Sequence, residues 1–124
     1  ETGSRTDLAR WLMMEYGRKK QEHLAAVFLN SRGKIISHRT MFIGTPTEAV
    51  VHPAPIVREA CLAGAASVIL VHNHPGQSPE PSNEDCESTA AIQRALESAG
   101  LKLTDHLIVS GNGFFSFFEH RLLD

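Results

Sequence analysis

The succession of apolar and polar segments predicts an α/β (α+β) fold in which a mixed β-sheet is flanked by helices. Three observations lead to this prediction. The run Ser67-Val68-Ile69-Leu70-Val71 suits a strand that is buried on both faces. Residues 83–99 carry apolar side chains at helical spacing. Gly111-Asn112-Gly113 lies between two strand-like segments and is a strong turn signal. Strands joined by a helix and strands joined by a tight turn together indicate a mixed sheet.

The first half of the chain predicts one helix and a hairpin. The helix, capped by Thr6 or Asp7, should end near Gly17, with four residues on its inner face: Leu8, Trp11, Leu12 and Tyr16. Residues 22–30 form a nearly continuous apolar run that suits a buried strand. After a turn that contains Gly33, residues 34–43 return as a second strand.

The second half adds two helices and three strands. Prolines at positions 53 and 55 fit only the opening turn of a helix, and the three prolines in loop 75–81 restrict its backbone. The predicted elements are a helix from 53 to about 63, a strand at 67–72, a helix at 83–99 closed by Gly100, and strands at 102–110 and 114–118. The predicted order is αββαβαββ.

Composition restricts the class of protein. The chain of 124 residues has the size of one domain, and its net charge of -2 gives no reason to expect a polyanionic partner. Cys61 and Cys86 form no C-x-x-C pair and fit a reducing compartment. No apolar stretch is long enough for a membrane span, so we expect a cytoplasmic protein without a membrane partner. The first three residues, Glu1-Thr2-Gly3, lack an initiator Met, so we do not count them as part of the domain. We expect a single domain at residues 4–124.

The motif with the most chemical content is His72-Asn73-His74-Pro75, followed by Asp85. Side chains at i and i+2 of a strand leave the same face, so both imidazoles can bind one ion. Asp85 falls in the first turn of the next helix, where the helix dipole favours a carboxylate. Two His and one Asp leave one tetrahedral position open, which is typical of catalytic zinc. The sequence therefore predicts Zn²⁺ bound by His72, His74 and Asp85.

Each part of this motif also has a simpler interpretation. A single His is more often hydrogen-bonded than a metal ligand, and Ser82-x-x-Asp85 is also a helix capping box. The two interpretations of Asp85 are compatible. A base must lie within hydrogen-bond reach of the metal-bound water, and the residues alone do not select it. Besides Glu22, four candidates remain: Glu48, Glu59, Glu80 and Glu84.

These residues carry a resemblance to a known family. His72-x-His74-Pro75, followed after six residues by Ser82-x-x-Asp85, resembles the motif of the JAMM (JAB, MPN-plus) zinc metalloproteases. Asn73 and the segment Pro79-Glu80-Pro81-Ser82 resemble the RadC-type branch in particular, and the likeness covers about residues 6–120. The resemblance implies the JAB/MPN fold, a mixed α/β sheet shared with cytidine deaminases. The deaminase signature itself, H-x-E with P-C-x-x-C, is absent.

The resemblance also implies roles for single residues. His72, His74 and Asp85 match the zinc ligands. Glu22 matches the glutamate that accepts a proton from the zinc-bound water, and Ser82 matches the hydroxyl that stabilises the oxyanion. The implied activity is the zinc-dependent hydrolysis of a peptide or isopeptide bond in a protein or peptide substrate.

Two other functions stay open. A RadC-like module without catalysis would associate with DNA repair or with other proteins, and its zinc would only stabilise the fold. A helix-hairpin-helix region commonly precedes this domain in RadC relatives, so DNA association would be indirect, through an N-terminal region that these residues do not provide. Metal-dependent cleavage of a phosphodiester is the third possibility, and one His₂Asp set fits it poorly because two-metal clamps are common there.

Overall fold

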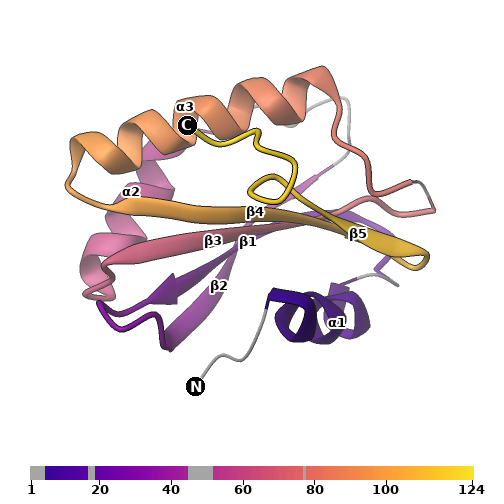
Figure 1. Ribbon diagram of the computed structural model, residues 1–124, viewed down its shortest axis with the longest axis horizontal. Coiled ribbons are helices and arrows are strands. Elements are labelled where there is room, and N and C mark those ends of the chain that lie inside the picture. The colour runs from indigo at the N-terminus through magenta and orange to yellow at the C-terminus, as the bar shows by residue number, and fades with distance from the viewer. Residues whose placement is uncertain (1–4, 17–18, 45–51, 77) are drawn as a thin grey trace.

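The computed structural model describes residues 5–16, 19–44, 52–76 and 78–124. Its elements are α1 (Arg5–Tyr16), β1 (Glu22–Leu29), β2 (Ile35–Gly44), α2 (Pro53–Leu62), β3 (Ser67–Asn73), α3 (Asn83–Ser98), β4 (Lys102–Ser110) and β5 (Gly113–Ser116). The strands form one mixed five-stranded sheet with helices on both faces (Figure 1). The predicted fold class and the predicted order of elements are confirmed.

The strand order is β2-β1-β3-β4-β5. β1 is antiparallel to both β2 and β3, whereas β3 and β4 are parallel and joined by α3. Parallel neighbours need a crossover connection, and α3 supplies it. Because β1 runs antiparallel to β3, the first residue of β1 lies beside the last residues of β3, at the same end of the strands. This arrangement brings Glu22 to His72, which lies 50 residues later in the chain.

Two apolar layers enclose the sheet. α1 packs on one face, where Leu12 and Tyr16 join side chains of β1, β3 and β4 (Figure 1). α2 and α3 cover the opposite face and contribute Ile56, Ile92 and Leu96 to its core. β1 and β3 lie inside the sheet and supply side chains to both layers, so they are buried along almost their whole length.

The start of α1 differs from the prediction. The described part of the helix begins at Arg5, so Thr6 and Asp7 lie inside it rather than just before its first turn. Trp11, expected in the core, is 43% exposed and directs its ring edge at His38, with the ring centroids 5.9 Å apart. His38 belongs to the edge strand β2, beyond the strands on which α1 chiefly packs. The prediction for Trp11 was therefore wrong because helical spacing does not show where the covered surface ends.

α2 and α3 begin and end within two residues of the predicted limits. Pro53 opens α2, as its fixed backbone and missing N–H allow. After α3, Gly100 has a φ of +79°, a left-handed conformation that glycine adopts without strain. Among the described helices, none combines the length and the apolarity that crossing a membrane would require.

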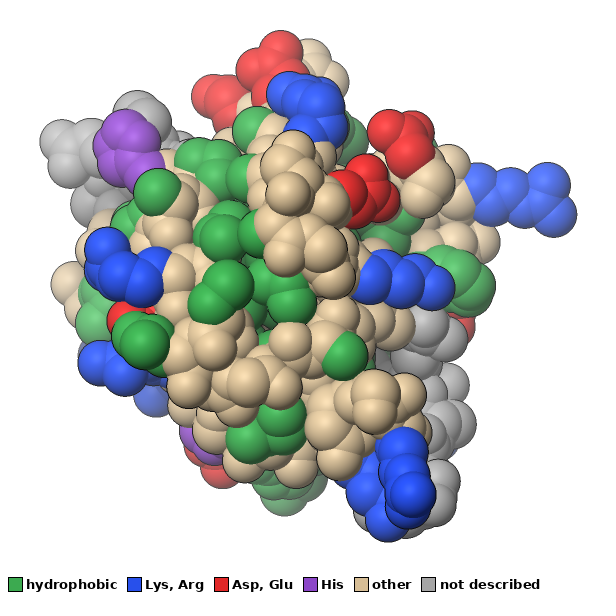
Figure 2. All heavy atoms as spheres, turned by 90° about the vertical axis from the view of Figure 1, so that its left-hand side faces the viewer, with side chains coloured by type: hydrophobic (Ala, Val, Ile, Leu, Met, Phe, Trp, Pro, Cys, Tyr) green, Lys and Arg blue, Asp and Glu red, His purple; other side chains and the backbone are tan. Residues whose placement is uncertain are grey.

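The end of the molecule where α2 and α3 terminate carries charges of both signs. Figure 2 views this end, which is the left-hand side of Figure 1. Basic and acidic side chains are interspersed there around hydrophobic ones. Leu62, at the last position of α2, is 75% exposed. Among the described residues of this face, the mixed charges form no continuous basic track of the kind that binds a polyanion.

Candidate metal centre

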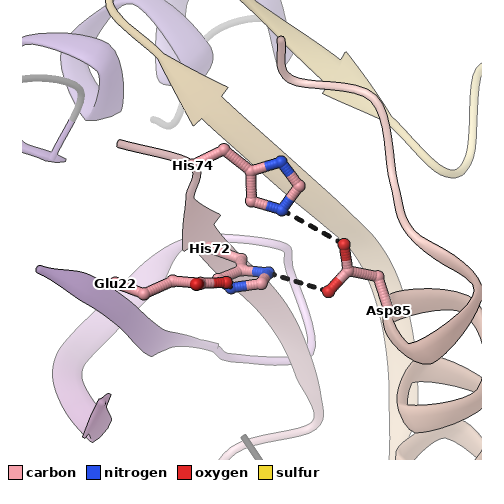
Figure 3. A group of neighbouring side chains, drawn as sticks. All are labelled: Glu22, His72, His74 and Asp85. Atoms are coloured by element: carbon pink, nitrogen blue, oxygen red, sulfur yellow. Dashed lines mark hydrogen bonds and ion pairs between the residues drawn. The ribbon is translucent and has the colours of Figure 1, made fainter. Parts of the chain in front are cut away.

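Four side chains meet where β1 begins and β3 ends: Glu22, His72, His74 and Asp85 (Figure 3). One ligand atom from each lies within 4.8 Å of the others. Each side chain is only 9% to 12% exposed. Glu22 opens β1, His72 lies in β3, and Asp85 lies in the first turn of α3. The fold thus brings the three predicted ligands and Glu22 into one buried cluster.

The His72 ring lies between two carboxylates. Its Nε2 contacts Oε1 of Glu22, and its Nδ1 lies 3.4 Å from Oδ1 of Asp85. The second oxygen of Asp85, Oδ2, lies 3.1 Å from Nε2 of His74 (Figure 3). The two imidazole rings have their centroids 4.9 Å apart and stand nearly perpendicular, at 86°. Asp85 therefore presents one oxygen to each imidazole.

A backbone contact sets the orientation of His74. Its Nδ1 lies 3.1 Å from the carbonyl oxygen of Ser78. A carbonyl only accepts, so Nδ1 carries the donated proton and Nε2 faces the cluster. Burial lowers the pKa of His74, but the hydrogen bonds to Asp85 and Ser78 and the nearby carboxylate charges outweigh it and raise the pKa above 6.5. A bound cation would compete with a proton for the Nε2 lone pair.

Asp85 is also part of a capping box. Its backbone N–H donates to Oγ of Ser82 at 3.0 Å, and its Oδ2 accepts the N–H of Ser82 at 2.9 Å. Burial raises the pKa of Asp85. The hydrogen bond from His74, the N–H of Ser82 and the charges of both imidazoles lower it further than burial raises it, and the pKa lies well below its usual range. Asp85 is therefore an ionised carboxylate held at the start of α3. It belongs to the capping box and to the cluster of imidazoles at the same time.

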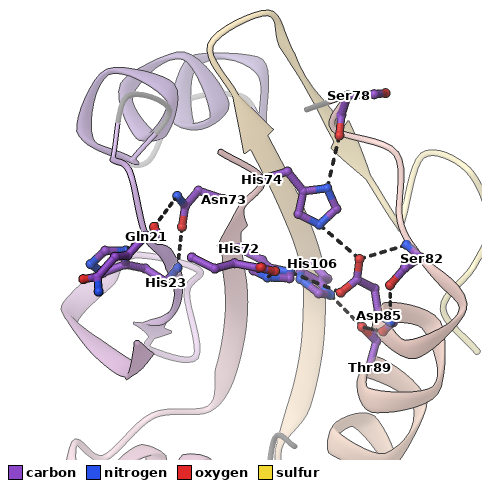
Figure 4. Close-up of polar contacts among 11 residues, drawn as sticks. Gln21, His23, His72, Asn73, His74, Ser78, Ser82, Asp85, Thr89 and His106 are labelled. Carbon is purple, nitrogen blue, oxygen red and sulfur yellow. Dashed lines mark hydrogen bonds and ion pairs between the residues drawn. The ribbon is translucent and has the colours of Figure 1, made fainter. Parts of the chain in front are cut away.

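A layer of buried side chains supports the cluster from behind (Figure 4). The ring of His106 stacks on His72, with centroids 6.0 Å apart, and on Phe117, at 4.6 Å. The hydroxyl of Thr89 donates to the carbonyl of Asp85 at 2.6 Å, and its oxygen lies 2.6 Å from Nδ1 of His106. Since Thr89 has one proton to donate, Nδ1 of His106 is the donor in their contact. Burial, and after it the charge of His72, lower the pKa of His106 to about 3, so this ring is neutral.

The role of Thr89 was not predicted from the sequence. Its position one helical turn after Asp85 could have drawn attention to it, because residues four apart lie on one face of a helix. His106, in contrast, follows a buried strand pattern, and only the sheet order shows that it lies behind His72.

The other acidic candidates lie apart from the cluster. Glu59 belongs to α2 and forms ion pairs with two arginines. Glu80 and Glu84 are exposed, and Glu48 lies outside the described residues. Among the described residues, Glu22 is therefore the one of the five candidates that lies beside the imidazoles.

The donor set fits a divalent ion that accepts nitrogen and oxygen ligands. Imidazole and carboxylate together suit Zn²⁺ and its first-row neighbours, whereas Ca²⁺ and Mg²⁺ prefer oxygen alone. In tetrahedral zinc with bonds of about 2.0–2.1 Å, ligand atoms are separated by roughly 3.4 Å. The 3.1 Å and 3.4 Å between Asp85 oxygens and the imidazole nitrogens are close to this value. The cluster can therefore hold a metal ion.

Comparison with known proteins agrees with this arrangement. The family model described as a RadC-like JAB domain matches residues 2–122, which include the whole cluster. The chain is 44% identical over 116 residues to a UPF0758 protein of Streptococcus agalactiae serotype Ia, covering 94% of this chain and 51% of that protein. It is 43% identical over 116 residues to a UPF0758 protein of Streptococcus equi subsp. zooepidemicus, covering 94% and 52%. It is 40% identical over 118 residues to a UPF0758 protein of Streptococcus thermophilus, covering 95% and 52%.

The chain spans about half the length of these relatives. The match extends over nearly all of its own residues, and its mixed sheet has the arrangement expected of the JAB/MPN fold. On these grounds, the chain belongs to the RadC-like JAB domain family.

Proposed function

We propose that this domain is a zinc-dependent hydrolase that cleaves peptide or isopeptide bonds with an activated water. The observation that carries the proposal is the convergence of Glu22, from a separate strand, on two imidazoles and the Asp85 carboxylate. The JAB family includes metallopeptidases, which favours the same chemistry. Structural zinc sites are closed by four protein ligands, whereas three ligands and a neighbouring base leave a position for water.

His72, His74 and Asp85 would hold the ion. His74 offers Nε2 because Ser78 occupies its Nδ1 proton, and Asp85 offers an ionised carboxylate. Zinc, when bound, lowers the pKa of a coordinated water to about 7 and polarises a carbonyl oxygen. Because the cluster is buried, the charge of a bound ion would lie in a region of low dielectric constant, where electrostatic interactions are strong.

Glu22 would act as the base and then as the acid. Its ligand atom lies within 4.8 Å of those of the three other residues, so a water beside them is within its reach. Its carboxylate accepts the proton of the attacking water while the water oxygen forms a bond to the carbonyl carbon. It then donates that proton to the amine nitrogen as the C–N bond breaks.

Ser82 would stabilise the negative charge that develops on the carbonyl oxygen. Its oxygen accepts the Asp85 N–H, which holds the side chain at the edge of the cluster. A hydroxyl that accepts one hydrogen bond still has its own proton to donate. Loss of such a donor typically lowers kcat by about 10²- to 10³-fold.

The experiment measures zinc content and turnover for the wild type, Glu22→Gln and His74→Ala. The probes are fluorogenic peptides and lysine isopeptides. We expect Glu22→Gln to keep its zinc and lose turnover by about 10²- to 10⁴-fold, as for a general acid–base, and His74→Ala to lose zinc. His52→Ala is the matched control, because His52 is exposed and makes no side-chain cap contact at the start of α2.

Full zinc content in His74→Ala would contradict the ligand assignment. A Glu22→Gln variant as fast as the wild type would contradict the role of Glu22 as the base. A zinc-loaded wild type that cleaves neither kind of probe would contradict hydrolysis and would favour a module without catalysis, in which zinc stabilises the fold.

A further inference from the structure

We infer that Asn73 is a positioning residue that holds Glu22 at the metal centre, an inference that rests on the proposed role of Glu22. Asn73 lies between the two histidines and is 1% exposed. Its Oδ1 accepts the backbone N–H of His23 at 2.5 Å, and its Nδ2 donates to the carbonyl oxygen of Gln21 at 2.9 Å (Figure 4). One side-chain amide thus binds the backbone on both sides of Glu22.

The end of the β1–β3 ladder explains why a side chain is needed there. The pairing of the two strands runs from Leu29–Ser67 to Leu24–His72. Continued in the same register, it would place Pro75 opposite Gln21. Proline has no backbone N–H, so it cannot donate to the Gln21 carbonyl. The amide of Asn73 has one donor group and one acceptor group, as a peptide bond has, and it satisfies the backbone that the ladder leaves open.

The location of Glu22 makes this contact important for chemistry. Glu22 is the first residue of β1, and it is paired on its other side with Gly44 at the end of the edge strand β2. Strand ends open more readily than strand centres. A base has to stay within hydrogen-bond distance of the water it activates, and a displacement of about 1 Å can lower the rate about 10²-fold.

Asn73 acts through Glu22 and does not join the metal cluster itself. Both ends of its amide are occupied by backbone groups of Gln21 and His23. Its neighbours in sequence, His72 and His74, direct their rings at Asp85. The same short segment therefore supplies two ligands and, between them, the anchor of the base.

Residue-resolved hydrogen exchange of the full chain tests the anchor without any assay of activity. Asn73→Ala should raise the exchange rate of the His23 amide about tenfold, while the amide of Val27, in the middle of β1, keeps its rate. Gln93→Ala is the matched control. Gln93 is 4% exposed, and its amide also binds one residue's backbone N–H and C=O, those of Asp124, at the other end of the chain. This control should leave His23 exchange unchanged.

Turnover on the peptide probes tests the consequence. Asn73→Ala should keep its zinc and its KM and lose about 10- to 100-fold in kcat, because the displaced base affects the chemical step alone. In a Glu22→Gln background, Asn73→Ala should lower the residual turnover no further, because both substitutions remove the same function, that of the base. Gln93→Ala should retain the wild-type kcat.

Each measurement can overturn the inference. Unchanged His23 exchange in Asn73→Ala would show that the amide does not anchor β1. A further loss of turnover in the Glu22→Gln background, or an equal loss in Gln93→Ala, would show that Asn73 does not act through Glu22. If the zinc-loaded wild type cleaves no probe, the proposed function fails, and the exchange rates still decide whether Asn73 holds the start of β1.

Discussion

Asp85 belongs both to the four-residue cluster that could hold a metal ion and to the first turn of α3, and two substitutions separate these contributions. Asp85→Asn keeps a side-chain oxygen that can accept the Ser82 N–H, but it removes the charge that faces His74. Asp85→Ala removes both contacts. The difference between the two variants therefore reports the cap, and the difference between wild type and Asp85→Asn reports the charge.

The expected loss can be worked out for protein in EDTA at pH 7. The folded pKa of Asp85 is lowered, so its contribution to stability is complete above its unfolded pKa, near 3.8, and is lost as pH falls toward the folded value. The charge-assisted hydrogen bond to His74 contributes about 2 kcal/mol, and the cap contributes about 1 kcal/mol. The free energy of unfolding should fall by about 2 kcal/mol in Asp85→Asn and about 3 kcal/mol in Asp85→Ala.

Zinc changes this comparison. At a free zinc concentration about 100 times the Kd, a protein that binds the ion only when folded gains about 2.7 kcal/mol. With an entropy of unfolding of about 2.1 cal/mol/K per residue, a chain of 124 residues should gain roughly 10 °C in Tm. A neutral amide is a poor zinc ligand, so neither Asp85 variant should gain a comparable amount.

Urea unfolding followed by circular dichroism, in EDTA and in zinc-buffered solution, measures all of these quantities. His52→Ala controls for the loss of a histidine outside the cluster and should respond to zinc as the wild type does. Zinc stabilisation of Asp85→Asn equal to that of the wild type would refute Asp85 as a ligand. Equal stabilities of the two Asp85 variants in EDTA would refute a separate contribution of the cap.

Acid should destabilise the wild type more than it destabilises His106→Phe. The pKa of His106 is about 3 in the folded protein and 6.5 in the unfolded chain, so between these values the unfolded chain binds one more proton. The free energy of unfolding of the wild type therefore falls by about 1.4 kcal/mol for each unit by which the pH is lowered. Urea unfolding at pH 6.5, 5.5 and 4.5 measures both slopes, and equal slopes would contradict this reasoning. Below the raised pKa of His74, the zinc Kd should increase about tenfold per pH unit in a chelator competition; a Kd independent of pH between 7 and 5 would argue against His74 as a ligand. Ile92→Ala, at a side chain 1% exposed in α3, should lower the free energy of unfolding by about 2–5 kcal/mol, whereas Leu62→Ala, at a side chain 75% exposed, should change it by less than about 0.5 kcal/mol. Similar losses in urea would show that burial does not separate the two sites.

The order of elements could be predicted because each element carries a local signal. Pro53 fits the start of a helix, and Gly100 allows the left-handed turn after α3. Which side chains of α1 are buried was harder to predict, because that depends on which strands lie beneath the helix. Trp11 has the right spacing for the core but faces the uncovered edge strand.

The sequence by itself determined which imidazoles and which carboxylate lie together. His72 and His74 share a face because strands repeat every two residues, and Asp85 is placed by a capping box that begins at Ser82. These are short-range relations, so they can be recognised without knowing the fold.

The family resemblance pointed to Glu22, but the residues by themselves left five candidates, and only the tertiary structure showed which glutamate joins the cluster. Glu22 lies 50 residues before His72 and reaches it because β1 pairs antiparallel with β3 in one register. The support from Thr89 and His106 and the anchor at Asn73 depend on the same long-range pairing. Strand register is set by side chains of the whole sheet and its two apolar layers, and no local pattern around Glu22 encodes it.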